Sequence, residues 1–173
     1  MWTLAYYLLT GRTALGKRRG AIARQYPEHI TVKGRFGVAP ADCERLIDLG
    51  KATLSGLLSL KVELRGPHSP GQNLVWYEVA DGSAELDRIR AAHVALRQSL
   101  QGEGILMKDL VDSRYEGNGF RPHFTVCLRE RQDTGVASAW PDKVRTRIVA
   151  WGIYRYAGTE PNLDLRPVHL ELA

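Results

Sequence analysis

Two four-residue segments of the chain share one pattern of side chains: His29-Ile30-Thr31-Val32 and His123-Phe124-Thr125-Val126. Successive side chains in an extended strand point to opposite faces, so the His and Thr of each segment share one face and the apolar pair shares the other. A neutral imidazole accepts a proton near physiological pH, and a charged imidazole donates one. The two segments therefore predict a pair of histidines that divide acid and base duties in one reaction.

Basic residues accompany both segments. Alternation predicts Lys33 and Arg35 on the face of His29, and Arg121 on the face of His123. Such cations suit a phosphodiester, because its nonbridging oxygens are anionic and accept charge-assisted hydrogen bonds. We expect Arg121 to contact the phosphate or ribose, because the proline that follows it restricts its backbone.

This chemistry is in-line displacement at phosphorus. One histidine takes a proton from the attacking water or hydroxyl, the other protonates the departing oxygen, and each threonine hydroxyl hydrogen-bonds a phosphoryl oxygen. The pattern leaves open which histidine is the base. The predicted catalytic residues are His29, Thr31, His123 and Thr125.

The spacing argues against a metal. Each segment gives a single imidazole, and no Asp, Glu or Cys stands at a ligand spacing beside either histidine, so we expect neither a metal nor a cofactor. Cys43 and Cys127 form no Cys-x-x-Cys pair, which favours reduced thiols. The excess of 24 Lys and Arg over 19 Asp and Glu, a formal charge of +5, favours anionic partners.

The composition is that of an ordinary globular protein. The 173 residues include 44% hydrophobic and 25% charged residues, with no apolar run long enough for a membrane span. We expect one domain over residues 1–173, monomeric, cytoplasmic and not bound to a membrane. Periodicity and turn residues predict helices over residues 13–25, 42–55, 83–101 and 137–143, and strands over residues 3–10, 29–36, 57–65, 73–80, 123–129, 147–156 and 163–172. This pattern is typical of an α+β protein with antiparallel sheets.

The paired His-x-Thr segments resemble the motifs of the two-histidine phosphoesterase superfamily, which includes bacterial RNA 2′-5′ ligases and 2′,3′-cyclic phosphodiesterases. The flanks agree, because an aromatic-Arg-Pro run precedes His123 and a basic residue follows the first segment. The resemblance covers most of the chain. It implies a bilobal fold in which two pseudo-symmetric antiparallel sheets, with helices on their outer faces, place the two motifs as opposite walls of a central cleft.

Aromatic residues are candidates for stacking a base beside the catalytic residues. The candidates are Tyr6, Tyr7, Phe36, Trp151 and Tyr154. Among these we predict Phe36 and Tyr154 as substrate contacts, together with Arg121, Lys33 and Arg35. Trp2, Trp76 and Trp140 are assigned to packing, and His68, His93 and His169 to structural positions.

The predicted function is metal-independent hydrolysis of a 2′,3′-cyclic phosphate or of 2′-5′ linked RNA or nucleotides. Its substrate is an RNA end or a small cyclic nucleotide. Two alternatives remain at this point: RNA 2′-5′ end joining, and a single-stranded RNA-binding module without catalysis. The alternatives differ in what they predict for the histidines, since binding alone does not depend on them.

Overall fold

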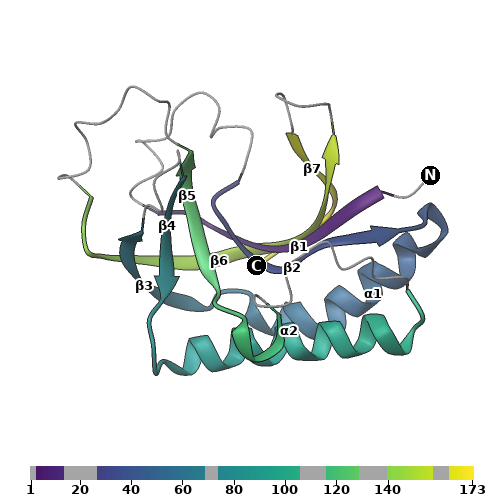
Figure 1. Ribbon diagram of the computed structural model, residues 1–173, viewed down its shortest axis with the longest axis horizontal. Coiled ribbons are helices and arrows are strands. Elements are labelled where there is room, and N and C mark those ends of the chain that lie inside the picture. Colours follow the sequence, from purple (N-terminus) through teal and green to yellow (C-terminus); the bar gives the residue numbers. More distant parts are fainter. Residues whose placement is uncertain (1–2, 14–26, 69–73, 106–115, 129–139, 158–163) are drawn as a thin grey trace.

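The computed structural model describes residues 3–13, 27–68, 74–105, 116–128, 140–157 and 164–173 (Figure 1). Its strands are β1 (Thr3–Gly11), β2 (His29–Val38), β3 (Lys61–His68), β4 (Leu74–Val79), β5 (His123–Leu128), β6 (Lys143–Ala157) and β7 (Asp164–Leu172). Its helices are α1 (Cys43–Leu54) and α2 (Ala84–Gly102), with 3-10 turns η3 (Pro40–Asp42), η4 (Ser55–Leu57) and η6 (Gly117–Gly119). The α+β class predicted from the sequence is confirmed.

The described strands form one sheet in the order β1-β2-β5-β4-β3-β6-β7. β6 is long enough to pair twice: Lys143 to Arg147 pair with β3, and Ile148 to Arg155 pair with β1. Because β6 also pairs with β1, the sheet closes on itself through β1, β2, β5, β4, β3 and β6. All the pairings among these strands are antiparallel.

This arrangement differs from the expectation of two separate sheets. The two motif strands, β2 and β5, are hydrogen-bonded neighbours within one sheet, and they do not face each other from opposite walls. Alternation within a strand fixes which residues share a face but not which strand lies beside it. The expectation of opposite walls came from the resemblance, and the described pairing replaces it.

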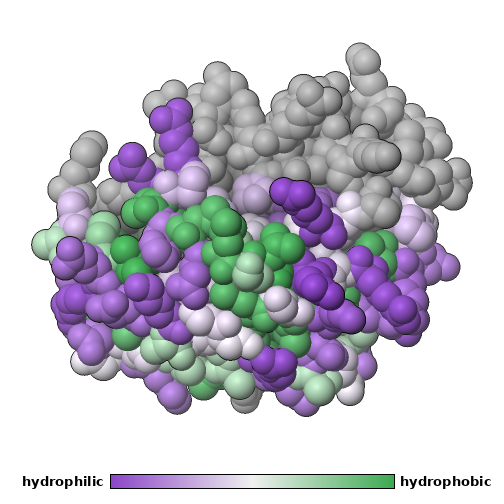
Figure 2. All heavy atoms as spheres, turned by 180° about the vertical axis from the view of Figure 1, so that it is seen from behind, coloured by the Kyte–Doolittle hydropathy of each residue, from purple (hydrophilic) through white to green (hydrophobic). Residues whose placement is uncertain are grey.

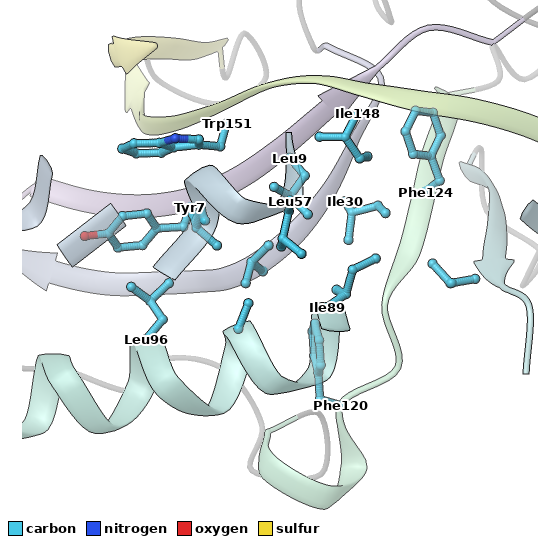
Figure 3. Packing of buried hydrophobic residues seen from close by; sticks show 14 of the residues in the cluster. Tyr7, Leu9, Ile30, Leu57, Ile89, Leu96, Phe120, Phe124, Ile148 and Trp151 are labelled. Carbon is cyan, nitrogen blue, oxygen red and sulfur yellow. The ribbon is translucent and has the colours of Figure 1, made fainter. Parts of the chain in front are cut away.

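Both described helices lie side by side on the same face of the sheet (Figure 1). α2 begins at Ser83, whose Oγ accepts a hydrogen bond of 3.2 Å from the Leu86 N–H, as an N-cap residue does. Its buried residues recur at helical spacing and meet the apolar side of β1, β2 and β5 in one core (Figure 3). This core face carries Ile30, Val32 and Phe124, each 0% exposed, as alternation in the two motifs predicts.

α1 packs against β6 through a glycine. A Cβ atom on Gly50 would collide with the indole ring of Trp151 and with Tyr7, so only glycine lets the helix approach this closely. Ser59, with a left-handed φ of 65°, then turns the chain out of η4 and into β3. β3 therefore begins at Lys61, and not at residue 57 as the sequence pattern predicts.

Most of the helix expected over residues 13–25 lies outside the described residues, as do residues 137–139 of the short helix expected over 137–143. The described remainder of that short helix is not helical, because Lys143 already begins β6. Seen from behind, the molecule shows an apolar patch bordered by hydrophilic residues (Figure 2). Within the described ranges, neither helix is apolar enough over a sufficient length to cross a bilayer.

Candidate active site

The two motif strands pair so that the histidine of one meets the threonine of the other. His29 lies opposite Thr125, and Ile30 lies opposite Phe124. The same antiparallel register, extended by one residue, sets Thr31 opposite His123. Diagonal neighbours on one face of such a pair lie about 7–8 Å apart. The register therefore makes His29 and His123 diagonal neighbours on one face of the sheet.

Both histidines make the same local contact. His29 Nδ1 lies 2.7 Å from the carbonyl oxygen of Pro27, and His123 Nδ1 lies 3.2 Å from that of Arg121. A carbonyl oxygen only accepts hydrogen bonds, so Nδ1 carries the hydrogen in each ring. Nε2 is then the ring nitrogen that can accept a proton. The contact to the residue two positions earlier fixes both rings in the same tautomer.

The surroundings of the two histidines differ. His29 is 8% exposed, whereas the His123 side chain is half-buried. The neighbouring Glu28 carboxylate accepts hydrogen bonds of 3.1 and 2.8 Å from the Thr13 N–H and hydroxyl, which ties the start of β2 to the end of β1. The site is therefore pseudo-symmetric in its hydrogen bonds but asymmetric in burial.

A β-bulge corrects the prediction for Lys33. Leu8 pairs with Thr31, but Tyr7 pairs with Lys33, so one extra residue enters β2 at this point. Lys33 consequently turns to the helix side, where it is 1% exposed and its Nζ lies 2.7 Å from Glu116 Oε1. It is a buried partner of Glu116 and not a substrate contact.

Phe36 is also not a substrate contact. It is 0% exposed in the core and stacks on Tyr7 with ring centroids 5.5 Å apart. A second register shift, between Tyr7 and Ala5, adds another residue to β2, so alternation again places Phe36 on the face that carries Ile30. Tyr154 does lie on the site face, opposite Tyr6, but it is 6% exposed. Burial raises the pKa of its phenol.

Two predicted site residues are placed by their backbone alone. Thr125 is opposite His29, and Arg35 lies in β2 beyond the bulge. The side chains of both lie outside the described part of the structure, so their roles remain predictions. Thr31 is half-buried, and its Cγ2 lies 3.2 Å from the position that a Cβ atom on Gly34 would occupy.

An aromatic residue that the sequence assigned to packing lies beside the site. The Trp76 ring centroid is 5.9 Å from that of His123, and His68 stacks on the same indole at 6.1 Å. Trp76 is on β4, directly opposite Thr125 of β5. No sequence pattern signals this contact, because it depends on which strand lies next to β5.

Arg121 is exposed just before β5 and lines a cavity of about 110 Å³. Arg90 of α2 lines the same cavity, as do the acidic residues Glu78 and Asp81. Glu78 is also directly opposite His123 in the sheet. An exposed cation therefore lies next to the second motif, in a cavity that it shares with two acidic residues.

The part of the chain that the structure describes holds no group of three or more His, Cys, Asp or Glu side chains placed to bind a metal ion. No protein-family model matches the sequence, and no curated protein matches it either. Solved structures do match. Escherichia coli LigT complexed with 3′-AMP aligns with a TM-score of 0.60 at 13% identity over 99% of this chain and 98% of that one.

The chain has the LigT fold. A structure described as a phosphoesterase aligns with a TM-score of 0.61 at 13% identity, again over 99% of this chain and 98% of that one. The protein TT0787 of Thermus thermophilus aligns with a TM-score of 0.54 at 16% identity over 98% of this chain and 97% of that one. Because LigT is a two-histidine phosphoesterase, the resemblance drawn from the paired motifs is confirmed at the level of the fold.

Proposed function

We propose that this protein is a phosphoesterase that uses His29 and His123 to open 2′,3′-cyclic phosphates of nucleotides or RNA ends. The observation that carries the proposal is the register of β2 and β5, which sets His29 opposite Thr125. The matching Nδ1 contacts to Pro27 and Arg121 support it, because they orient both rings for proton transfer through Nε2.

The reaction follows from these groups. The Nε2 of one histidine takes a proton from water as the water oxygen attacks phosphorus. The bond from phosphorus to one ribose oxygen breaks, and the other histidine gives its Nε2 proton to that oxygen. The product is a phosphate monoester on the remaining ribose oxygen. After product release, proton exchange with solvent restores both rings.

The threonines stabilise the phosphoryl oxygens in this proposal. A hydroxyl donates one hydrogen bond to an anionic oxygen, and such charge-assisted bonds strengthen as charge develops in the transition state. Thr31, on β2, would donate a hydrogen bond to one phosphoryl oxygen, and Thr125, on β5, would donate to another. Arg121 would add a cation at the edge of the site.

Trp76 is the residue that we propose stacks the base. Its ring lies beside His123, so a base held against it would belong to the nucleotide whose phosphate lies between the histidines. Base–aromatic stacking contributes about 1–3 kcal/mol per base and is tolerant of base identity. Crystal structures of LigT contain 3′-AMP in one case and phosphate in another, which fits a nucleotide substrate here.

The test is a product analysis with purified protein in the presence of a chelator. The substrates are the four 2′,3′-cyclic nucleotides, 2′-5′ linked oligonucleotides, and RNA ends carrying a 2′,3′-cyclic phosphate with an acceptor 5′-hydroxyl. We expect a monoester from the cyclic substrates. His29→Ala and His123→Ala should each lower its rate of formation by at least about 100-fold, and His169→Ala, on β7, serves as the matched histidine control.

Other results would redirect the proposal. Joined RNA ends as the dominant product would assign end joining in place of hydrolysis. Salt-sensitive RNA binding without turnover, unchanged by the two histidine substitutions, would make the protein a binding module. Equal turnover by the wild type and by His123→Ala would exclude the two-histidine mechanism.

A further inference from the structure

A buried polar cluster beneath the site connects the two motif-bearing segments. It consists of Lys33, His93 and Glu116, which are 1%, 1% and 9% exposed. We call these three residues the clamp. Lys33 follows the first motif on β2, Glu116 precedes the segment that leads into the second motif, and His93 comes from α2.

The first connection of the clamp is an ion pair. Lys33 Nζ lies 2.7 Å from Glu116 Oε1, with side-chain exposures of 0% and 6%. Removing two charges from water costs several kcal/mol per ion, which their attraction offsets only with good geometry. A buried pair is thus weak support for stability, and fixing the relative position of two segments is its better-attested use. Here it joins residues 83 positions apart.

The second connection passes through His93. Its Nδ1 lies 2.7 Å from the carbonyl oxygen of Val32, and its Nε2 accepts a hydrogen bond of 3.2 Å from the Gly117 N–H. Nδ1 therefore donates to Val32, and Nε2, which also lies 3.6 Å from Glu116 Oε2, presents a lone pair to Gly117. One imidazole thus spans the backbone of β2 and the backbone of η6.

The third connection is a stack. The Phe120 ring lies 4.0 Å from the His93 ring at an angle of 11°. Phe120 stands three residues before His123, at the end of η6. Through this stack α2 contacts the chain three residues before the second motif.

The hydrogen-bonded pairing between the two motif strands, β2 and β5, is short. The register between β2 and β5 is described at two residue pairs, whereas that between β1 and β2 is described at seven. The clamp lies on the helix side of this short ladder, immediately after Thr31 and shortly before His123. We propose that the clamp positions His123 relative to His29 and Thr31, and that Lys33, His93 and Glu116 are positioning residues for the reaction.

This inference rests on the proposed function for its kinetic consequence but not for its structural one. The clamp touches neither the phosphate nor the base in this proposal. Its loss should therefore change the alignment of reacting groups and not the contacts that bind substrate. A misplacement of about 1 Å can lower a rate by about 100-fold. The signature is a fall in kcat with little change in KM.

The experiment compares two substitutions of one residue. His93→Phe keeps a flat ring against Phe120 but loses both hydrogen bonds. His93→Gln supplies an amide that can donate to Val32 and accept from Gly117. Leu54→Ala, in α1, is the control for lost stability, because Leu54 is 0% exposed and its removal leaves a core cavity. Kinetics on a 2′,3′-cyclic nucleotide and amide hydrogen exchange are measured well below each variant's Tm.

We expect His93→Phe to lower kcat by about 10- to 100-fold with KM within about twofold. Amide exchange in residues 116–128 should quicken, while exchange in β1 and β6 stays as in the wild type. His93→Gln should restore most of both properties. Leu54→Ala should lower Tm and leave kcat unchanged.

Each contrary result has one meaning. If the wild type is active and His93→Phe keeps its kcat, the clamp does not position the site, and the proposed function stands. If the wild type is inactive on every substrate, the proposed function fails, and exchange alone decides whether the clamp holds residues 116–128. If Leu54→Ala lowers kcat as much as His93→Phe does, the effect is general destabilisation and the inference is wrong.

Discussion

His29 and Thr125 lie directly opposite each other on neighbouring antiparallel strands. Because both motifs have the same spacing, this one relationship also sets Thr31 opposite His123 when the register is extended by one residue. In the proposed reaction, a single phosphate bound over this pair of strands would meet both motifs from the same side. Two motifs of the same His-x-Thr spacing on antiparallel neighbouring strands would thus form a pseudo-two-fold site within one sheet.

Replacing His123 by Ala should lower kcat by roughly 10²–10⁴-fold, the usual contribution of a general acid or base. The side chain is half-buried and its described hydrogen bond is to the carbonyl oxygen of Arg121, so the fold should tolerate the change. Initial rates on a 2′,3′-cyclic nucleotide and a thermal unfolding curve check both statements. A variant that unfolds with the wild-type Tm and retains full activity would exclude His123 from the chemistry.

Replacing Trp76 by Leu should raise KM for cyclic nucleotides by roughly 5- to 150-fold, which corresponds to the loss of one stacked base. The effect should disappear on ribose 2′,3′-cyclic phosphate, because that substrate has no base. The measurement is KM for the cyclic nucleotide divided by KM for ribose 2′,3′-cyclic phosphate, determined for the wild type and for the variant.

Trp140→Phe is the control for this comparison, since Trp140 is 8% exposed and belongs to the core. It should leave the ratio unchanged. Equal increases in KM on both substrates for Trp76→Leu would mean that the indole supports His123 and does not stack a base.

The sequence predicted which motif residues lie in the core better than it predicted which strands lie beside the motifs. Alternation correctly put Ile30, Val32 and Phe124 in the core, because each has the two-residue period of a strand packed on one side. The α2 helix was predicted within one residue at each end by its cap at Ser83 and its apolar spacing. These features are local, so a single stretch of chain contains all the information.

The remaining features depend on partners far along the chain. The bulge that turns Lys33 into the core is stabilised by Glu116, 83 residues away, and strict alternation therefore placed Lys33 on the wrong face. Trp76 reaches His123 because β4 pairs with β5, which no spacing within either strand reveals. Sheet order decides such contacts, and sequence pattern alone does not determine it.

The buried ion pair predicts a particular pattern of stability. Lys33→Met should lower the free energy of unfolding by about 3–5 kcal/mol, because it leaves the Glu116 carboxylate buried without its cation. Lys33→Met combined with Glu116→Leu should be more stable than that single variant, since no unpaired charge remains. Urea unfolding of the wild type, Lys33→Met, Glu116→Leu and the double variant checks the order. A double variant as unstable as the two single losses added together would show that the two charges act independently.

Arg121 should contribute to substrate binding through its charge. It is exposed beside the second motif, so Arg121→Ala should raise KM for a cyclic nucleotide by about 10-fold, the lower end for a hydrogen bond to a charged group. Because the contact is screened by salt, wild-type KM should rise between low and high ionic strength more steeply than KM of the variant. Arg145→Ala on β6 is the charge-matched control, with a side chain 80% exposed. Parallel salt dependence in wild type, Arg121→Ala and Arg145→Ala would mean that Arg121 is a solvated surface charge that does not meet the phosphate.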